Sequence, residues 1–198
     1  MGHPGARGEY VEFPLCTFDL KTGIFCSRCR EKIRQGLYDE FDIKVMRLLL
    51  ELEKRFPRLQ KAGYVKAVDG KETILIVLKE GSLREVRFKD LASLRRILSE
   101  RLGKHVRIVE DSSDVVRFIE GVITPARIVA VNKIWLPDGS EEMRVILDSK
   151  RNLKVGVNSL IEVVKKVKGV KLSVDFERGW RRVEVRRPRK VKEKSSIG

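Results

Sequence analysis

Apolar side chains in the middle of the chain follow first a helical spacing and then an alternating one. From residue 43 to residue 56 they recur as on one face of a helix, which predicts a helix that has Asp42 as its N-cap and ends before Pro57. Two β-branched runs follow, at 64–68 and 73–78, and the Asp-Gly pair between them is typical of a hairpin turn. The pattern therefore predicts a helix followed by two antiparallel strands.

The next stretch returns to a helical spacing and then to alternation. Leucines and isoleucines between residues 91 and 102 mark an amphipathic helix that ends at Gly103, because glycine suits the left-handed position after a helix. Residues 105–109 then alternate between apolar and polar side chains, as a strand does. Residues 42–111 thus predict a unit with the order helix, strand, strand, helix, strand.

Residues 112–177 repeat this order. The Asp-Gly pairs of the two stretches lie 69 residues apart, and Gly103 lies 66 residues before Gly169, which indicates a duplicated module. Each copy can bury its helices against one face of a three-stranded sheet, so the expected fold class is α+β. The elements expected in the second copy are a helix over 114–123, strands over 127–136 and 143–148, a helix over 160–167 and a strand over 170–176.

Two short motifs near the boundary between the copies narrow the interpretation. Residues 102–110 read Leu-Gly-Lys-His-Val-Arg-Ile-Val-Glu, and Pro-Ala-Arg stands at 125–127 after the following helix. With the helix leading each unit, the chain from 42 to 177 resembles the tandem type II KH domains of archaeal NusA-like proteins. The resemblance implies two KH-like modules, RNA binding without catalysis, and a role in transcription elongation or termination.

The chain departs from this family at the loop with which a KH domain grips RNA. The family has Gly-x-x-Gly there, so that the RNA backbone approaches the main chain closely. At this place the first copy has residues 86–91, Val-Arg-Phe-Lys-Asp-Leu, and the second copy has residues 150–157. Gly156 is the only glycine left in these two segments. The alternatives to RNA contact are loops that are only solvated, or degenerate modules that dock proteins. Both loops still carry basic side chains, and these predict contacts with RNA phosphates. The residues are Arg84, Arg87, Lys89, Lys150, Arg151 and Lys154.

A net charge of +15 favours a polyanionic partner, and nucleic acid is the first candidate. Residues 1–41 are neutral, whereas 42–111 carry +6, 112–177 carry +2 and the C-terminal arm, 178–198, carries +7. Such an arm can neutralise phosphates without reading sequence, and an aromatic ring among arginines suits base stacking. The alternatives are a tail that only aids solubility and a Trp180 that packs on the last strand. The RNA contacts expected in the arm are Arg178, Trp180, Arg181, Arg182, Arg186, Arg187, Arg189 and Lys190.

The three cysteines all lie in the N-terminal head, residues 1–41. Cys26 and Cys29 have the spacing of a zinc knuckle, and Asp19 follows Cys16 at the same interval. These four residues are the expected ligands of a structural zinc ion, with His3 as the alternative fourth ligand. A disulfide within the cysteine set, or free thiols, are the other possibilities.

The sequence carries no signature of a catalytic site. Walker, dinucleotide-binding and Gly-x-Ser-x-Gly motifs are missing, and the two histidines lie far apart in the chain. We therefore expect a protein without enzymatic activity whose partner is RNA, either rRNA or a nascent transcript, in contact with a ribosome or an RNA polymerase. Two other hypotheses stay open: a ribosomal or ribosome-associated protein that binds structured rRNA, and a protein-interaction adaptor.

Hydropathy and composition suggest where the protein works. No run of about eighteen apolar residues is present, and the first residues lack the apolar core of a secretory signal. We expect a cytoplasmic protein with neither a membrane nor a small-molecule substrate as partner. The high share of charged residues, 36%, with few amides resembles a hyperthermophile's composition.

Overall fold

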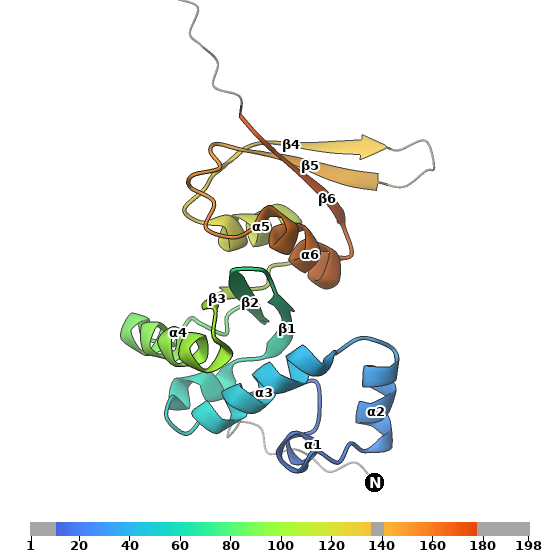
Figure 1. The fold of residues 1–198 in the computed structure, drawn as a ribbon, viewed down its shortest axis with the longest axis vertical. Coiled ribbons are helices and arrows are strands. Elements are labelled where there is room, and N and C mark those ends of the chain that lie inside the picture. The colour runs from blue at the N-terminus through green and yellow to red at the C-terminus, as the bar shows by residue number, and fades with distance from the viewer. Residues whose placement is uncertain (1–10, 136–140, 178–198) are drawn as a thin grey trace, which may run out of the picture.

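The computed structural model describes residues 11–135 and 141–177 (Figure 1). The second Asp-Gly pair, at 138–139, the C-terminal arm and His3 lie outside the described residues. The described part is a mixed α+β structure with six α-helices and two three-stranded sheets. None of these helices is both long enough and apolar enough to cross a membrane.

The first α/β unit has the predicted order of elements. β1 runs antiparallel to β2, β2 runs parallel to β3, and the strand order is β1-β2-β3. A short 3₁₀ helix, η1, begins at the proline that was expected to follow the first helix. The elements are α3 (Glu40–Leu52), η1 (Pro57–Lys61), β1 (Tyr64–Asp69), β2 (Thr73–Leu78), α4 (Phe88–Leu102) and β3 (His105–Glu110).

The second unit repeats the order, the pairing and the sheet topology of the first. β4 is antiparallel to β5, and β5 is parallel to β6. Gly103 and Gly169 end equivalent helices with positive φ angles of 72° and 68°, which confirms their predicted role. The elements are α5 (Val115–Ile123), β4 (Ile128–Trp135), β5 (Glu141–Leu147), α6 (Val157–Lys168) and β6 (Lys171–Phe176).

The first sheet is buried on both faces. Ile74 and Ile76 of β2 belong to a core shared with α3 and α4, whereas Leu75 and Val77 belong to a second core shared with α5 and α6. Figure 1 shows α5 and α6 lying between the two sheets. The two units are therefore joined through apolar packing, and β2 is the central strand of the whole molecule.

The turn between β1 and β2 is pressed against the second unit. A Cβ atom at Gly70 would lie 2.2 Å from the hydroxyl oxygen of Ser159 on α6 and 2.5 Å from the carbonyl oxygen of Thr73, so a side chain here would force the turn to shift. Close by, the hydroxyl of Thr73 donates a long 3.5 Å hydrogen bond to the carbonyl of Lys154. The loop before α6 is thus fixed to the beginning of β2.

The head consists of two short helices, α1 (Thr17–Thr22) and α2 (Ser27–Arg34), that pack on the first unit. Leu15, Leu20 and Cys29 are each at most 2% exposed and belong to the same core as α3. The chain before α1 also pairs with the beginning of β1, because the amide of Tyr64 donates to the carbonyl of Glu12 at 2.9 Å. The head is therefore part of the first core.

The predicted N-cap of α3 is wrong, because the helix begins one turn earlier. Asp39 is the N-cap, and Asp42 is the third helical residue of a capping box: each carboxylate accepts from the other residue's amide, at 2.9 and 3.0 Å. Asp42 is fully buried and also accepts from the Tyr64 hydroxyl at 2.7 Å and the Ala67 amide at 2.8 Å. Its second oxygen forms a 2.5 Å ion pair with Lys66. The sequence singled out Asp42 as a residue of the helix start, but neither its true position in the capping box nor its tertiary partners were predicted.

The substitution Asp42→Asn tests this buried network. The new amide can keep an acceptor for Tyr64 and Ala67, but it leaves the charge of Lys66 buried and unpaired, so we expect a loss of about 3–5 kcal/mol in the free energy of unfolding. The control is Asp69→Asn, which removes a far more exposed pair with Lys104, and we expect it to cost at most about 1 kcal/mol. Urea unfolding followed by circular dichroism measures both; equal losses would contradict the role given to Asp42.

Candidate metal centre

Four side chains of the head converge on one point. Their ligand atoms, the sulfurs of Cys16, Cys26 and Cys29 and a carboxylate oxygen of Asp19, all lie within 4.8 Å of one another. This confirms that the four residues predicted from their spacing come together. With zinc–sulfur bonds of about 2.3 Å, neighbouring sulfurs of a tetrahedral site lie roughly 3.8 Å apart. The sulfurs of Cys16 and Cys26 are 4.0 Å apart, close to that separation.

The four ligands come from equivalent positions of two helices. Cys16 is the N-cap of α1 and Asp19 is its third residue, just as Cys26 is the N-cap of α2 and Cys29 its third residue. An N-cap and a third helical residue lie on the same side of a helix start, so each helix presents two ligands together. The repeated interval in the sequence is thus the signature of two helix starts that face each other.

Hydrogen bonds tie the two helix starts together reciprocally. The amide of Cys16 donates to the sulfur of Cys29 at 3.3 Å, and the amide of Cys26 donates to the carboxylate of Asp19 at 2.9 Å. In a capping box this bond forms within one helix; here each N-cap amide is satisfied by the third residue of the other helix. Both pairs of ligands are held in place by the protein's own backbone.

These contacts determine the ionisation of the site. The hydrogen bond from the Cys26 amide holds the pKa of Asp19 below its usual value, so this carboxylate is ready to coordinate a cation. Burial raises the pKa of the Cys29 thiol, because a thiolate there loses its hydration. A metal ion supplies the positive charge that a buried Cys29 thiolate requires.

Two basic side chains brace the segments that carry the ligands. Lys32 donates to the carbonyl of Pro14 at 2.7 Å, in the segment that leads into α1. Arg30 donates to the carbonyl of Phe25 at 3.0 Å, just before Cys26. Both donors belong to α2, so this helix holds in place the segment that precedes each pair of ligands.

The donor set fits a structural metal better than a catalytic one. Four protein ligands close a tetrahedral site and leave no position for water or substrate. The three cysteines are free thiols, so no disulfide competes for the sulfurs. Within 11–135 and 141–177 no second group of this kind is found, and His105 lies away in β3.

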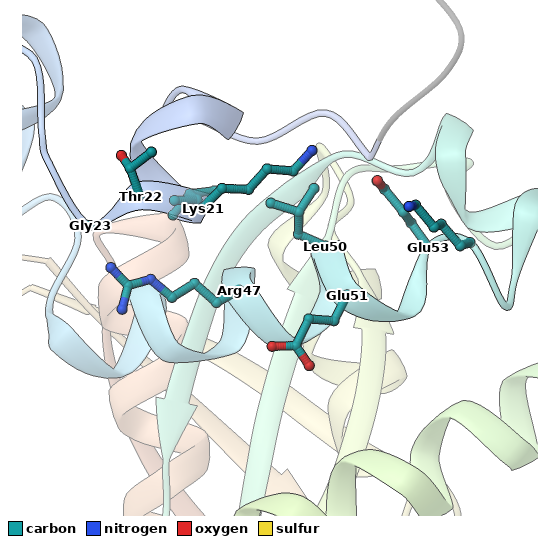
Figure 2. Close-up of a pocket in the computed structure, with 9 residues that line it drawn as sticks. Lys21, Thr22, Gly23, Arg47, Leu50, Glu51 and Glu53 are labelled. Atoms are coloured by element: carbon teal, nitrogen blue, oxygen red, sulfur yellow. The ribbon is translucent and has the colours of Figure 1, made fainter.

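A separate pocket lies beside the head, between α1 and α3 (Figure 2). Its volume is about 460 Å³, and Leu20 and Leu50 contribute its apolar lining. Its charged residues have both signs, with Lys21, Arg47 and Lys54 against Glu51 and Glu53, so it carries no strong net field. No cysteine lines it, and the pocket is distinct from the four ligands.

The structure does not bring the two predicted basic loops together. One follows the end of β2 and the other is fixed at its beginning, so the central strand separates them. All six side chains are exposed, and none forms an ion pair with another described residue. The residues in question are Arg84, Arg87 and Lys89 in the first loop and Lys150, Arg151 and Lys154 in the second. The arm residues 178–190 that were predicted to contact RNA lie outside the described residues.

The sequence analysis missed one exposed aromatic residue in the first loop. Phe88 begins α4 and is 78% exposed. It stands between Arg87 and Lys89, the same mixture of aromatic and basic residues that singled out Trp180. That mixture of aromatic and basic residues is the signal in the sequence that marks Phe88.

Comparisons with known proteins add little to this description. No family model matches the chain, and no curated protein matches it. Among solved structures, one described as "Crystal structure of APE1850" superposes with a TM-score of 0.45 at 19% sequence identity, over 64% of this chain and 96% of that one. A similarity of this degree carries no argument about function.

Replacement of Cys29 by Ser tests the metal centre. We expect the wild-type protein to hold one metal ion per chain and the variant to hold none, as measured by mass spectrometry of the purified full chain. Loss of the ion removes folding free energy, so the midpoint of thermal unfolding should fall by about 10 °C or more, at ~2–4 °C per kcal/mol.

The matched control is Asp19→Cys, which keeps four ligands and should keep the ion. A chelator should lower the unfolding midpoint of the wild-type protein but leave that of Cys29→Ser unchanged. A wild-type protein without stoichiometric metal would contradict the assignment.

Proposed function

We propose that this protein binds RNA and acts in transcription elongation or termination, as the NusA-like proteins it resembles do. The two α/β units are then degenerate type II KH modules, and the C-terminal arm adds phosphate contacts. The head is held by a structural zinc ion on Cys16, Asp19, Cys26 and Cys29. The repeated element order and the converging thiols support this proposal. Co-purification with RNA polymerase, and not with ribosomes, distinguishes this role from ribosome association.

The observation that carries the proposal is the unneutralised charge of the basic loop, residues 84–89. Arg84, Arg87 and Lys89 are exposed and have no carboxylate partner among the described residues. The loop's own carboxylate, Glu85, is occupied by Lys61 at 2.8 Å and so does not offset them. Exposed cations without partners are available to replace the counterions of a phosphate backbone.

Phe88 gives the same loop a second mode of contact. Its ring is exposed between two cations, and an aromatic face can stack on an unpaired base of any identity. Side-chain stacking and charge can thus replace the close backbone approach that the missing glycines would have allowed. We infer that the loop binds single-stranded RNA with little sequence preference.

Removal of two charges from the basic loop tests the phosphate contacts. The double variant Arg87→Gln and Lys89→Gln should bind single-stranded RNA about 3–10-fold more weakly, and the slope of log affinity against log salt should fall by roughly one per lost contact. Fluorescence anisotropy at several salt concentrations measures both quantities.

The control double variant, Arg101→Gln and Lys104→Gln, removes the same formal charge from residues already paired with Glu51 and Asp69. It should retain most of the affinity and the slope. An equal loss of affinity in both variants would show that binding depends only on net charge, and it would contradict a site in the loop.

Replacement of Phe88 by Ala tests the stacking contact separately. The ring is exposed, so stability should change little, whereas affinity for single-stranded RNA should fall by about 1–3 kcal/mol and affinity for duplex RNA should not. Phe18→Ala is the matched control, because Phe18 is 69% exposed but lies in the head. Unchanged single-strand binding in the Phe88 variant would exclude stacking at this position.

A further inference from the structure

A small cleft lies between the segment 55–59, which includes the start of η1, and the end of the basic loop. Its volume is about 230 Å³. Arg55 and Arg58 line it from one wall, and Arg87 lines it from the other, where the loop enters α4. We call it the arginine cleft.

Hydrogen bonds hold the two walls of the arginine cleft together. Nη1 of Arg58 donates to the carbonyl of Glu85 at 3.0 Å, and the ammonium of Lys61 donates to both carboxylate oxygens of Glu85 at 3.0 and 2.8 Å. The amide of Gly63 also donates to the hydroxyl of Ser82 at 3.1 Å, which binds the start of the loop to the chain after η1. The cleft is therefore formed before any ligand arrives.

The charges that line the arginine cleft do not balance. Arg55 and Arg87 are exposed, and neither forms an ion pair with a residue in 11–135 or 141–177. Arg58 bonds to a carbonyl and has no carboxylate partner among these residues. Within the described part of the chain, Asp90 is the one carboxylate in the lining, against three arginines. The cleft thus attracts anions.

A larger pocket on the other side of the contact between Arg58 and Glu85 does not show this excess. Its volume is about 510 Å³, and its described lining has four cations and three carboxylates. Two of the cations are already paired, Lys61 with Glu85 and Lys79 with Glu12, each at 2.8 Å. An anion therefore gains more in the arginine cleft than in this neighbouring pocket.

The floor of the arginine cleft is apolar. Phe56 and Leu59 line it and are only 7% and 2% exposed, and Pro57 and Val86 add further apolar surface. Sites that enclose a whole small molecule begin at roughly 300 Å³, so this cleft suits one unit of a longer ligand. An apolar floor below a cationic rim matches a base that is attached to a phosphate.

We propose that the arginine cleft holds one nucleotide of a single-stranded RNA, an inference that rests on the proposed function. Arg55 and Arg87 bind its phosphate from opposite walls, since guanidinium groups offer paired donors to phosphate oxygens. The base contacts the apolar floor and stacks on the guanidinium of Arg55, which lies 5.8 Å from the centre of the Phe56 ring. Phe88 directly follows Arg87, so the neighbouring base can stack on its exposed ring.

The substitution Arg55→Gln tests the second wall of this site in the full chain. Arg55 is exposed and has no ion pair, so the midpoint of thermal unfolding should stay the same. Affinity for single-stranded RNA should fall about 3–10-fold, and the slope of log affinity against log salt should fall by roughly one. Fluorescence anisotropy at several salt concentrations measures both quantities.

The matched control is Arg47→Gln, because Arg47 is also exposed and without an ion pair among the described residues but lies in α3, beside another pocket. It should keep the affinity and the slope. The inference is overturned if Arg55→Gln binds RNA as the wild-type protein does, or if Arg47→Gln loses as much affinity. If Arg55→Gln is unchanged while the double variant Arg87→Gln and Lys89→Gln binds more weakly, the loop keeps its role and only the cleft is refuted. A wild-type protein that binds no RNA would refute the proposed function itself.

Methyl NMR of the full chain tests the contact with the base. Adenosine monophosphate should shift the methyl resonances of Leu59 and Val86, which line the cleft, and inorganic phosphate should shift them much less. The methyl resonances of Leu20, which lines the separate pocket between α1 and α3, should not move with either ligand. Equal shifts with both ligands would show that the cleft binds phosphate alone and would overturn the assignment of a nucleotide site.

Discussion

The buried carboxylate of Asp42 is the contact on which the first unit depends most. Its two oxygens bind the start of α3, the backbone of β1 and the side chains of Tyr64 and Lys66. Lys66 also donates to the carbonyl of Leu37 at 2.7 Å, in the link between α2 and α3. One side chain thus fixes a helix, a strand and the connection to the head. Burial and the nearby charge of Asp42 raise the pKa of Tyr64, which keeps the phenol protonated as a donor.

Local signals in the sequence were sufficient for most elements. The β-branched run at 73–78 and the glycines at 103 and 169 act through backbone preferences that do not depend on distant residues. The role of Asp42 could not be predicted in this way, since its partners Tyr64 and Lys66 lie 22 and 24 positions away. The burial of β2 on both faces had a signal, because its six residues carry almost no polar side chain, as in sheets covered on two sides.

The candidate sites, too, were predictable only where their residues lie close together in the sequence. The metal ligands were predictable because each pair lies within one helix start, and the repeated interval records that geometry directly. Net charge counted along the sequence could not tell paired cations from unpaired ones. Lys61 and Arg87 look alike in the sequence, yet only Lys61 has a carboxylate beside it.

The double burial of β2 has a consequence for how far apart the two basic loops stand. One loop follows the last residue of this strand and the other is fixed beside its first residue, so six residues of extended backbone, about 17 Å along the strand, separate their anchor points. A strand packed on both faces cannot shorten or slide. The separation between the two anchor points is therefore fixed, and under the proposed function only an RNA long enough to span it can contact both loops at once.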